Sequence, residues 1–216
     1  MLRNLSHRKM DRITAVTVNY NTPDFIERLI KGFRKFYNIP LLIVDGSDTD
    51  KFEQLREVVH KSINIELHHF TYNIHHGPGM AYAFRELKSS QILLLDSDLE
   101  VINNGFVEDL QSKLRTDSYG IGDIQTVNDR GFNVKEGIKY LHPACALINR
   151  KVALQFPMPV KHGAPMIETM TAIHEQGLSD ILQHESWVTN DFRNRKKIYV
   201  SHGWQGTVKR EGGYNL

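Results

Sequence analysis

Short apolar runs alternate with amphipathic segments through the first hundred residues. The apolar runs, rich in aliphatic and β-branched residues, predict strands at 13–18, 41–44, 65–70 and 92–95. The segments between them carry apolar residues at helical spacing and predict helices at 23–36, 51–61 and 79–87. Strands alternating with helices are typical of a parallel sheet. We therefore expect an α/β, Rossmann-like fold with a mostly parallel central sheet and helices on both faces.

The second half of the chain is less regular. Its apolar pattern predicts helices at 105–114 and 166–176, the latter ending at Gly177, and a short helix up to residue 156. Strands are expected at 120–124, 144–149 and 198–200, and residues 129–139 are expected to form a loop or a hairpin. Since no repeat or low-complexity linker divides the sequence, we expect one domain over residues 1–216.

Composition narrows the class of protein. A net charge of +2 over 216 residues is too small to indicate a nucleic-acid partner. No apolar run reaches the roughly 18 residues of a transmembrane helix, and the basic residues 1–12 lack the apolar core of a secretory signal. The single cysteine, Cys145, lies in an apolar run, so we expect an inert core residue and a reducing, cytoplasmic location.

The clearest chemical signal follows the fourth predicted strand. Four aliphatic residues, 92–95, indicate a strand buried on both faces, and the next residues include Asp96 and Asp98. Carboxylates are rarely buried unless they are paired or bind a metal. We expect both at the carboxyl end of a central strand, where open α/β sheets bind ligands. The alternative is that Asp96 caps the next helix and Asp98 is solvated.

Other candidate ligands fall at the same predicted edge. Asp45 follows the second strand, and a glycine-rich loop at residues 77–79 follows the third. Because the carboxyl ends of parallel strands share one edge, Asp45, Asp96 and Asp98 should converge there. Clustered carboxylates without cysteine suit a hard cation, Mn²⁺ or Mg²⁺, that keeps positions open for phosphate oxygens. A metal-bridged nucleoside diphosphate is the simplest ligand for such an edge.

Several motifs, taken in order, make the sequence similar to a known family. They are Val16-Thr17-Val18-Asn19-Tyr20-Asn21, Leu42-Ile43-Val44-Asp45-Gly46-Ser47, residues 73–79 followed by Ala81 and Ala83, Leu95-Asp96-Ser97-Asp98, and His202. Together they resemble the family 2 glycosyltransferases of the GT-A fold, with Asp96 and Asp98 corresponding to the two aspartates of the family's DXD motif. The resemblance covers residues 13–202 and implies an enzyme that uses nucleotide-diphosphate sugars, with a UDP-sugar as the expected donor.

The resemblance also implies roles for the matched residues. The implied nucleotide-binding residues are Asn19, Tyr20, Asp45, His76, Gly77 and Asp96, and the implied metal ligands are Asp98 and His202. Within this group Asp45 would hydrogen-bond the nucleobase, and Asp96 would contact the ribose or a metal-bound water. Residues 13–100 would form the nucleotide-binding half, 101–205 the acceptor and catalytic half, and 206–216 a tail.

The implied reaction needs one general base. An acceptor hydroxyl on a glycan or glycoconjugate displaces the nucleotide diphosphate in line, which inverts the anomeric centre, and a carboxylate takes the hydroxyl proton. The family's Glu-Asp pair corresponds to Ile167-Glu168, which leaves Glu168 as the candidate base. The family's Arg-Asn pair after the small-residue helix is Phe84-Arg85 here, so the donor phosphate contacts are expected to differ.

Each candidate residue also has a simpler interpretation. Asp45 could cap its own turn, Glu168 could be a first-turn acid favoured by the helix dipole, and His202 could be an ordinary packed histidine. The histidines at 68, 69, 75 and 76 suggest zinc, but they straddle a strand end and a glycine segment without cysteine partners. Trp204 is a candidate acceptor contact, and the basic run 193–197 a candidate anion or membrane contact.

Three other functions compete with the transferase. A haloacid-dehalogenase-like phosphatase also places Asp-x-Asp after an apolar strand, but it does so after the first strand. A nucleotidyltransferase would need a glycine-rich loop with a basic residue after the first strand, which residues 19–23 do not supply. A nucleotide- or sugar-binding module without catalysis stays open, and it predicts nucleotide binding without sugar transfer.

Overall fold

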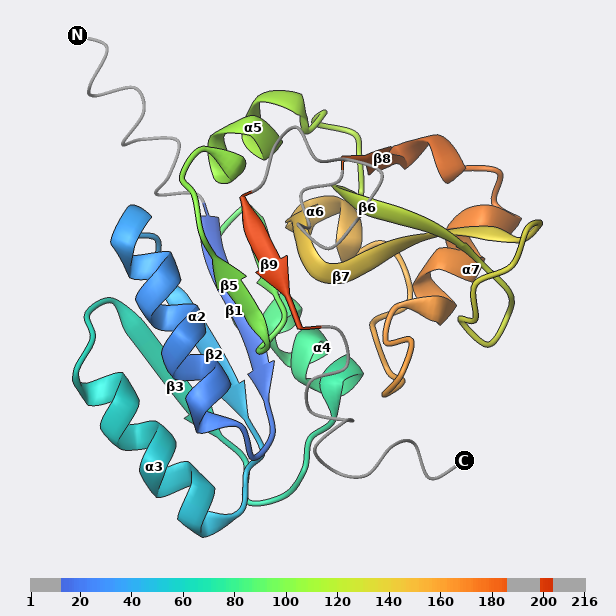
Figure 1. Cartoon of the computed structure of the whole chain (residues 1–216). Coiled ribbons are helices and arrows are strands. Elements are labelled where there is room, and N and C mark those ends of the chain that lie inside the picture. The colour runs from blue at the N-terminus through green and yellow to red at the C-terminus, as the bar shows by residue number, and fades with distance from the viewer. Residues whose placement is uncertain (1–12, 186–198, 204–216) are drawn as a thin grey trace, which may run out of the picture.

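The structure is a computed structural model that describes residues 13–185 and 199–203. Its main sheet has seven strands in the order β3-β2-β1-β4-β7-β6-β8 (Figure 1). The strands are β1 (Ile13–Asn19), β2 (Leu41–Asp45), β3 (Ile65–His69), β4 (Gln91–Leu95), β6 (Gly120–Val127), β7 (Ile138–Asn149) and β8 (Leu182–His184). The four strands from β3 to β4 are parallel, β7 is antiparallel to both β4 and β6, and β8 is parallel to β6. The predicted mostly parallel sheet is confirmed.

Helices cover both faces of this sheet, as predicted. One face packs against α2 (Pro23–Phe36), α3 (Thr49–His60) and α5 (Phe106–Lys113), and the other against α4 (His76–Glu86), α6 (Arg150–Ala153) and α7 (Ile167–Glu175). Figure 1 shows α2 and α3 side by side, and a 3₁₀ turn (Ser179–Ile181) joins α7 to β8. No helix within the described residues is long and apolar enough to span a membrane.

Strand side chains alternate between two hydrophobic cores. Leu93 and Leu95 of β4 pack on the side of α2 and α5, whereas Leu94 packs on the side of α4 and α7. This two-sided burial explains why β4 is apolar at successive positions. Cys145 of β7 lies in the first core opposite Leu95, which confirms its predicted core position, and burial raises the pKa of its thiol.

The hairpin of β6 and β7 is longer than predicted. We expected strands at 120–124 and 144–149, but pairing continues to Val127 and starts at Ile138, with a register shift between Gly122 and Ile124. Of the residues added to β6, Gln125 is half-buried, Thr126 is exposed and Val127 is buried, and the added part of β7 buries Tyr140 and Leu141. These buried residues are interrupted by polar ones, so the hydrophobic pattern did not predict the longer strands.

The glycine-rich segment at 77–79 is part of a helix, and the expected loop is wrong. α4 begins at His76, and the Gly77 N–H donates to the Lys161 carbonyl at 3.0 Å. A Cβ atom on Gly77 would lie 2.5 Å from the Lys161 oxygen, and one on Gly79 would lie 2.7 Å from the Val18 side chain. The glycines therefore allow close packing of the first turn of α4 against the chain at Lys161 and against β1.

Candidate active site

Two short strands connect the end of β4 to His202. β5 (Leu99–Val101) begins directly after Asp98 and pairs antiparallel with β9 (Val200–His202), so that Leu99 lies opposite His202 (Figure 1). The sequence pattern missed β5 and placed the last strand too early, because three-residue strands are too short for a clear period. This pairing brings a residue from the far end of the described chain beside the Asp96–Asp98 turn.

Asp96, Asp98 and His202 form one cluster. The His202 Nε2 atom lies 2.9 Å from Asp98 Oδ1 and 3.2 Å from Asp96 Oδ2, and one candidate ligand atom from each residue lies within 4.8 Å of the others. The side chains are 3% exposed for His202, 8% for Asp98 and 20% for Asp96, so the cluster opens to solvent on the Asp96 side. The two metal ligands that the resemblance implied, Asp98 and His202, thus lie together with Asp96, whereas Asp45, which was expected to converge with Asp96 and Asp98, is not part of this group.

The charges in this cluster stabilise one another. Burial lowers the pKa of His202, but hydrogen bonds to Asp96 and Asp98 outweigh it and raise that pKa to about 9. Burial raises the pKa of Asp96, yet the hydrogen bond from His202 and the charge of His76 bring it well below its ordinary value. At neutral pH a proton on His202 therefore lies between the two carboxylates, where a bound cation would otherwise balance their charge.

Two more histidines adjoin the cluster. His76, in the first turn of α4, places Nε2 3.4 Å from Asp96 Oδ1, on the side where Asp96 is exposed. His142 of β7 has its ring 6.3 Å from the ring of His202, and burial lowers its pKa. Sequence reasoning predicted His76 and missed His142. In the sequence, the available signal was the position of His142 two residues before the apolar run that begins at Ala144. In the structure the Ala144 carbonyl accepts the N–H of Asp96 at 2.9 Å.

The chemistry of the cluster fits a divalent cation. Two carboxylates and one imidazole offer hard oxygen ligands and one nitrogen, a set that suits Mn²⁺ or Mg²⁺ better than a thiolate-seeking metal. Within the described residues, this trio is the one group of metal-ligating side chains with atoms this close together.

Asp45 belongs to a second, fully buried cluster. Its side chain is 0% exposed; Oδ1 accepts from Asn19 Nδ2 at 2.8 Å and from Ser47 Oγ at 2.6 Å. Oδ2 lies 2.7 Å from His69 Nδ1 and accepts from the Ser47 N–H at 3.3 Å. Asn19 also accepts from Thr22 Oγ1 at 2.7 Å, and the Asn21 N–H donates to Ser47 Oγ at 2.8 Å, which joins the loops after β1 and β2. The direct contact between Asp45 and a nucleobase stays a prediction, and Ser47 supports the turn interpretation.

Glu168 and Tyr20 lie at the surface or near it. Glu168 is in the first turn of α7 with an exposed side chain, while the adjacent Thr169 is buried and donates to the Pro157 carbonyl at 2.7 Å. Among the described residues Glu168 makes no hydrogen bond or ion pair. Tyr20 directly follows β1 and is half-buried. Both assignments therefore stay predictions.

The four histidines that suggested zinc have separate partners. His68 Nδ1 lies 2.9 Å from the Tyr82 hydroxyl, His69 pairs with Asp45, and His76 pairs with Asp96. The ring of His75 contacts that of His162, with centroids 5.6 Å apart. A shared metal would need their nitrogens to converge, so this quartet is not a zinc site.

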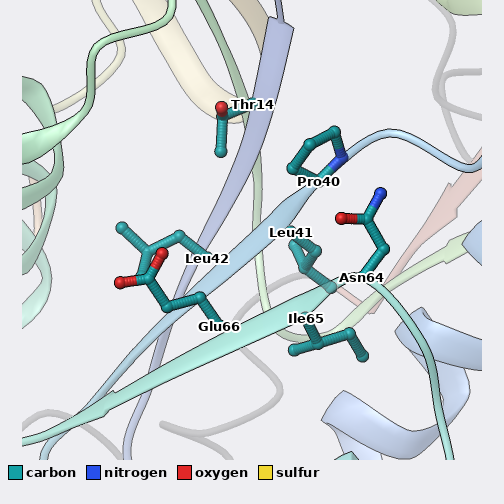
Figure 2. Close-up of a pocket in the computed structure, with 7 residues that line it drawn as sticks. All are labelled: Thr14, Pro40, Leu41, Leu42, Asn64, Ile65 and Glu66. Carbon is teal, nitrogen blue, oxygen red and sulfur yellow. The ribbon is translucent and has the colours of Figure 1, made fainter. Parts of the chain in front are cut away.

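One shallow pocket lies away from all of these groups. Figure 2 shows its lining, which comes from the amino ends of β1, β2 and β3 and from the chain before them: Thr14, Pro40, Leu41, Leu42, Asn64, Ile65 and Glu66. The predicted site residues follow the carboxyl ends of the strands, at the opposite edge of the sheet. Two further candidates, Trp204 and the basic run 193–197, lie outside the described residues.

Solved structures of similar fold include two complexes with nucleotide sugars. A mannosyltransferase from Pyrobaculum calidifontis, in complex with GDP-Man and Mn²⁺, matches with a TM-score of 0.59 and 16% identity, covering 84% of this chain and 58% of that one. S. aureus TarS 1–349 in complex with UDP-GlcNAc matches with a TM-score of 0.58 and 17% identity, covering 88% of this chain and 58% of that one. Glucosyl-3-phosphoglycerate synthase from Mycobacterium tuberculosis, in complex with phosphoglyceric acid, matches with a TM-score of 0.60 and 14% identity. The match covers 86% of this chain and 74% of that one.

These likenesses establish the GT-A fold, and the sequence establishes the family. The chain spans about three fifths of the length of the mannosyltransferase and of TarS 1–349. No curated protein matches the sequence. The sequence does match the family described as glycosyl transferase family 2 over residues 14–172, which is most of the chain and includes β1, β2 and the Asp96–Asp98 turn. The Asp96–Asp98 turn also follows the fourth strand rather than the first, where the phosphatase alternative would place it. The chain belongs to glycosyl transferase family 2.

Proposed function

We propose that this protein is an inverting, metal-dependent glycosyltransferase that moves a sugar from a nucleotide diphosphate to a hydroxyl of a glycan or glycoconjugate. The observation that carries the proposal is the Asp96–Asp98–His202 cluster at the carboxyl edge of the sheet. Relatives in fold hold GDP-Man with Mn²⁺ and UDP-GlcNAc, which supports a nucleotide-sugar donor. A UDP-sugar is the donor to test first, and a GDP-sugar the second.

Asp96, Asp98 and His202 would hold Mn²⁺ or Mg²⁺ next to the donor diphosphate. When bound, such an ion supplies positive charge that stabilises the leaving diphosphate. Asp98 fixes the position of this charge, since it is the least exposed carboxylate of the cluster. His76, 3.4 Å from Asp96 on the open side, is placed to contact the donor phosphates or ribose. Gly77 positions His76 by packing the first turn of α4 against Lys161.

Glu168 is the proposed general base. In-line displacement needs a carboxylate on the acceptor side to take the hydroxyl proton as the bond forms, typically for about 10²–10⁴-fold in rate. α7 contributes Glu168 from the second half of the chain, which we assign to the acceptor and to catalysis (residues 101–205), whereas residues 13–100 bind the nucleotide. No side chain becomes glycosylated in this scheme, because the hydroxyl itself attacks the anomeric carbon.

Thermal unfolding with UDP, GDP, dTDP and CDP, each with and without Mn²⁺, tests the donor site. A ligand at 100 times its dissociation constant stabilises the folded state by about 2.7 kcal/mol, which is easily measured. We expect one diphosphate to raise the melting temperature only with metal, and the rise to vanish in Asp98→Asn. Asp117→Asn is the matched control, because Asp117 pairs with Arg115 at the exposed surface. No rise with any diphosphate would refute the proposal.

A binding module without catalysis is the second candidate function. Glu168 is exposed and makes no polar contact among the described residues, which favours this alternative. Release of the free diphosphate from UDP- and GDP-sugars, measured with simple glycosides as acceptors, separates the two. Release that depends on metal and falls at least tenfold in Glu168→Gln would support the transferase, whereas tight binding without release would support the module.

A further inference from the structure

Three residues lie in a row across the carboxyl ends of β1, β2 and β3. Asn19 pairs in register with Asp45, and Asp45 pairs in register with His69. Their side chains point to the same face of the sheet and contact one another, at 2.8 Å from Asn19 Nδ2 to Asp45 Oδ1 and 2.7 Å from His69 Nδ1 to Asp45 Oδ2. The row is thus a continuous polar chain that ends in an imidazole.

Asp45 has no remaining capacity to bind a ligand. A carboxylate offers about four acceptor positions. Asn19, the Ser47 hydroxyl, the Ser47 N–H and His69 occupy them, and the side chain is 0% exposed. A nucleobase could reach Asp45 only by breaking one of these bonds, and each bond to a buried carboxylate is costly to break. Asp45 is therefore placed to orient its neighbours.

His69 is the member of the row that reaches solvent. Its side chain is 19% exposed, and its ring stacks on Phe52 of α3 with centroids 3.8 Å apart and planes 17° apart. Since the Asp45 carboxylate only accepts hydrogen bonds, Nδ1 carries the proton and Nε2 is left as an acceptor. No described residue bonds Nε2, and Nε2 is not among the buried polar atoms without a partner, so it is accessible.

We propose that His69, oriented by Asp45 and Phe52, reads the nucleobase of the donor by accepting a ring N–H at Nε2. This inference rests on the proposed function. β3, which carries His69, and β4 are separated by β2 and β1, so the base would bind about 14 Å along the sheet edge from the cluster that would hold the metal and diphosphate. On the base-pairing edge of the ring, uracil, thymine and guanine carry a ring N–H, whereas cytosine and adenine carry a ring nitrogen with a lone pair.

A paired change in ligand and protein tests this contact. UDP is compared with 3-methyl-UDP, and GDP with 1-methyl-GDP, with Mn²⁺ present, in the wild-type protein and in His69→Ala. We expect methylation to weaken wild-type binding of the preferred diphosphate at least tenfold and to weaken binding to the variant less than threefold. His69→Ala alone should cost roughly 3–10-fold, the value of one hydrogen bond.

His68→Ala is the matched control, because His68 is the preceding residue of β3, faces the opposite core and bonds Tyr82. It should keep the full methylation penalty. If His69→Ala unfolds, His69→Asn retains an N–H for Asp45 on a shorter side chain and is measured instead. An equal methylation penalty in wild type and variant, no penalty in wild type, or preference for CDP or ADP would overturn the role of His69. Failure of every diphosphate to bind would instead refute the proposed function.

Discussion

The two carboxylate clusters at the carboxyl edge of the sheet are built in opposite ways. Asp45 is completely buried, and four donors from three strands or their turns occupy its acceptor positions. Asp96 and Asp98 share one histidine, and Asp96 stays 20% exposed. A saturated carboxylate holds neighbouring groups in place, whereas a pair with unbalanced charge attracts a cation. Aspartate therefore has a structural role at one end of the sheet edge and the proposed metal-binding role at the other.

Substituting each aspartate should separate these roles most strongly. Asp45→Asn loses charge-assisted bonds to Asn19, Ser47 and His69 and should lower the free energy of unfolding by about 2–4 kcal/mol. Asp98→Asn should cost only roughly 1 kcal/mol without metal, because one charged bond to His202 is lost and Asp96 remains. Urea unfolding of both variants checks this, and equal losses would contradict the comparison.

The first turn of α4 should show an intermediate effect. In Gly77→Ala the new Cβ would meet the backbone of Lys161 at 2.5 Å, so the packing beside His76 must shift, at a cost of about 1–3 kcal/mol. Gly177→Ala is the control: it has a φ of +70° with no neighbouring atom within 4 Å, and should cost about 1 kcal/mol from backbone strain alone. Nucleotide binding should weaken in Gly77→Ala and stay unchanged in Gly177→Ala.

The pH dependence of metal binding should be the most gradual effect. His202 must lose its proton to bind a metal, and its pKa is raised from 6.5 to about 9. Mn²⁺ affinity should therefore rise by up to tenfold per pH unit between pH 6.5 and 8.5. Without metal the sign reverses, because the stability contributed by the charged histidine is complete below pH 6.5 and is lost as the pH rises towards 9.

Calorimetric Mn²⁺ titrations and metal-free melting curves at several pH values measure the two opposed trends. His202→Gln should flatten both, because its amide does not titrate in this range. A metal affinity that does not change with pH in the wild-type protein would show that His202 does not bind the ion.

How much the sequence reveals differs between the two clusters. The apolar run of β4 and the acids after it predict the position of Asp96 and Asp98, because a strand buried on both faces has a continuous apolar signature. The partners of Asp45 were not predictable in the same way. His69 reaches it through register between parallel strands, and no local pattern encodes register between segments 24 residues apart. His142 was missed because the apolar run that predicted this strand begins only at Ala144, whereas β7 itself begins at Ile138.

The pairing of β5 with β9 makes the proposed metal site depend on a strand that is synthesised long after the two aspartates. Asp96 and Asp98 are synthesised about a hundred residues before His202, and the third ligand arrives only with β9. A nascent chain on the ribosome would therefore have two of the three proposed ligands while the roughly hundred residues between Asp98 and His202 are made. If these residues hold the ion as proposed, metal affinity and docking of β9 are linked, so that whatever detaches the strand also releases the ion. Binding of Mn²⁺ would then report that β9 has paired with β5.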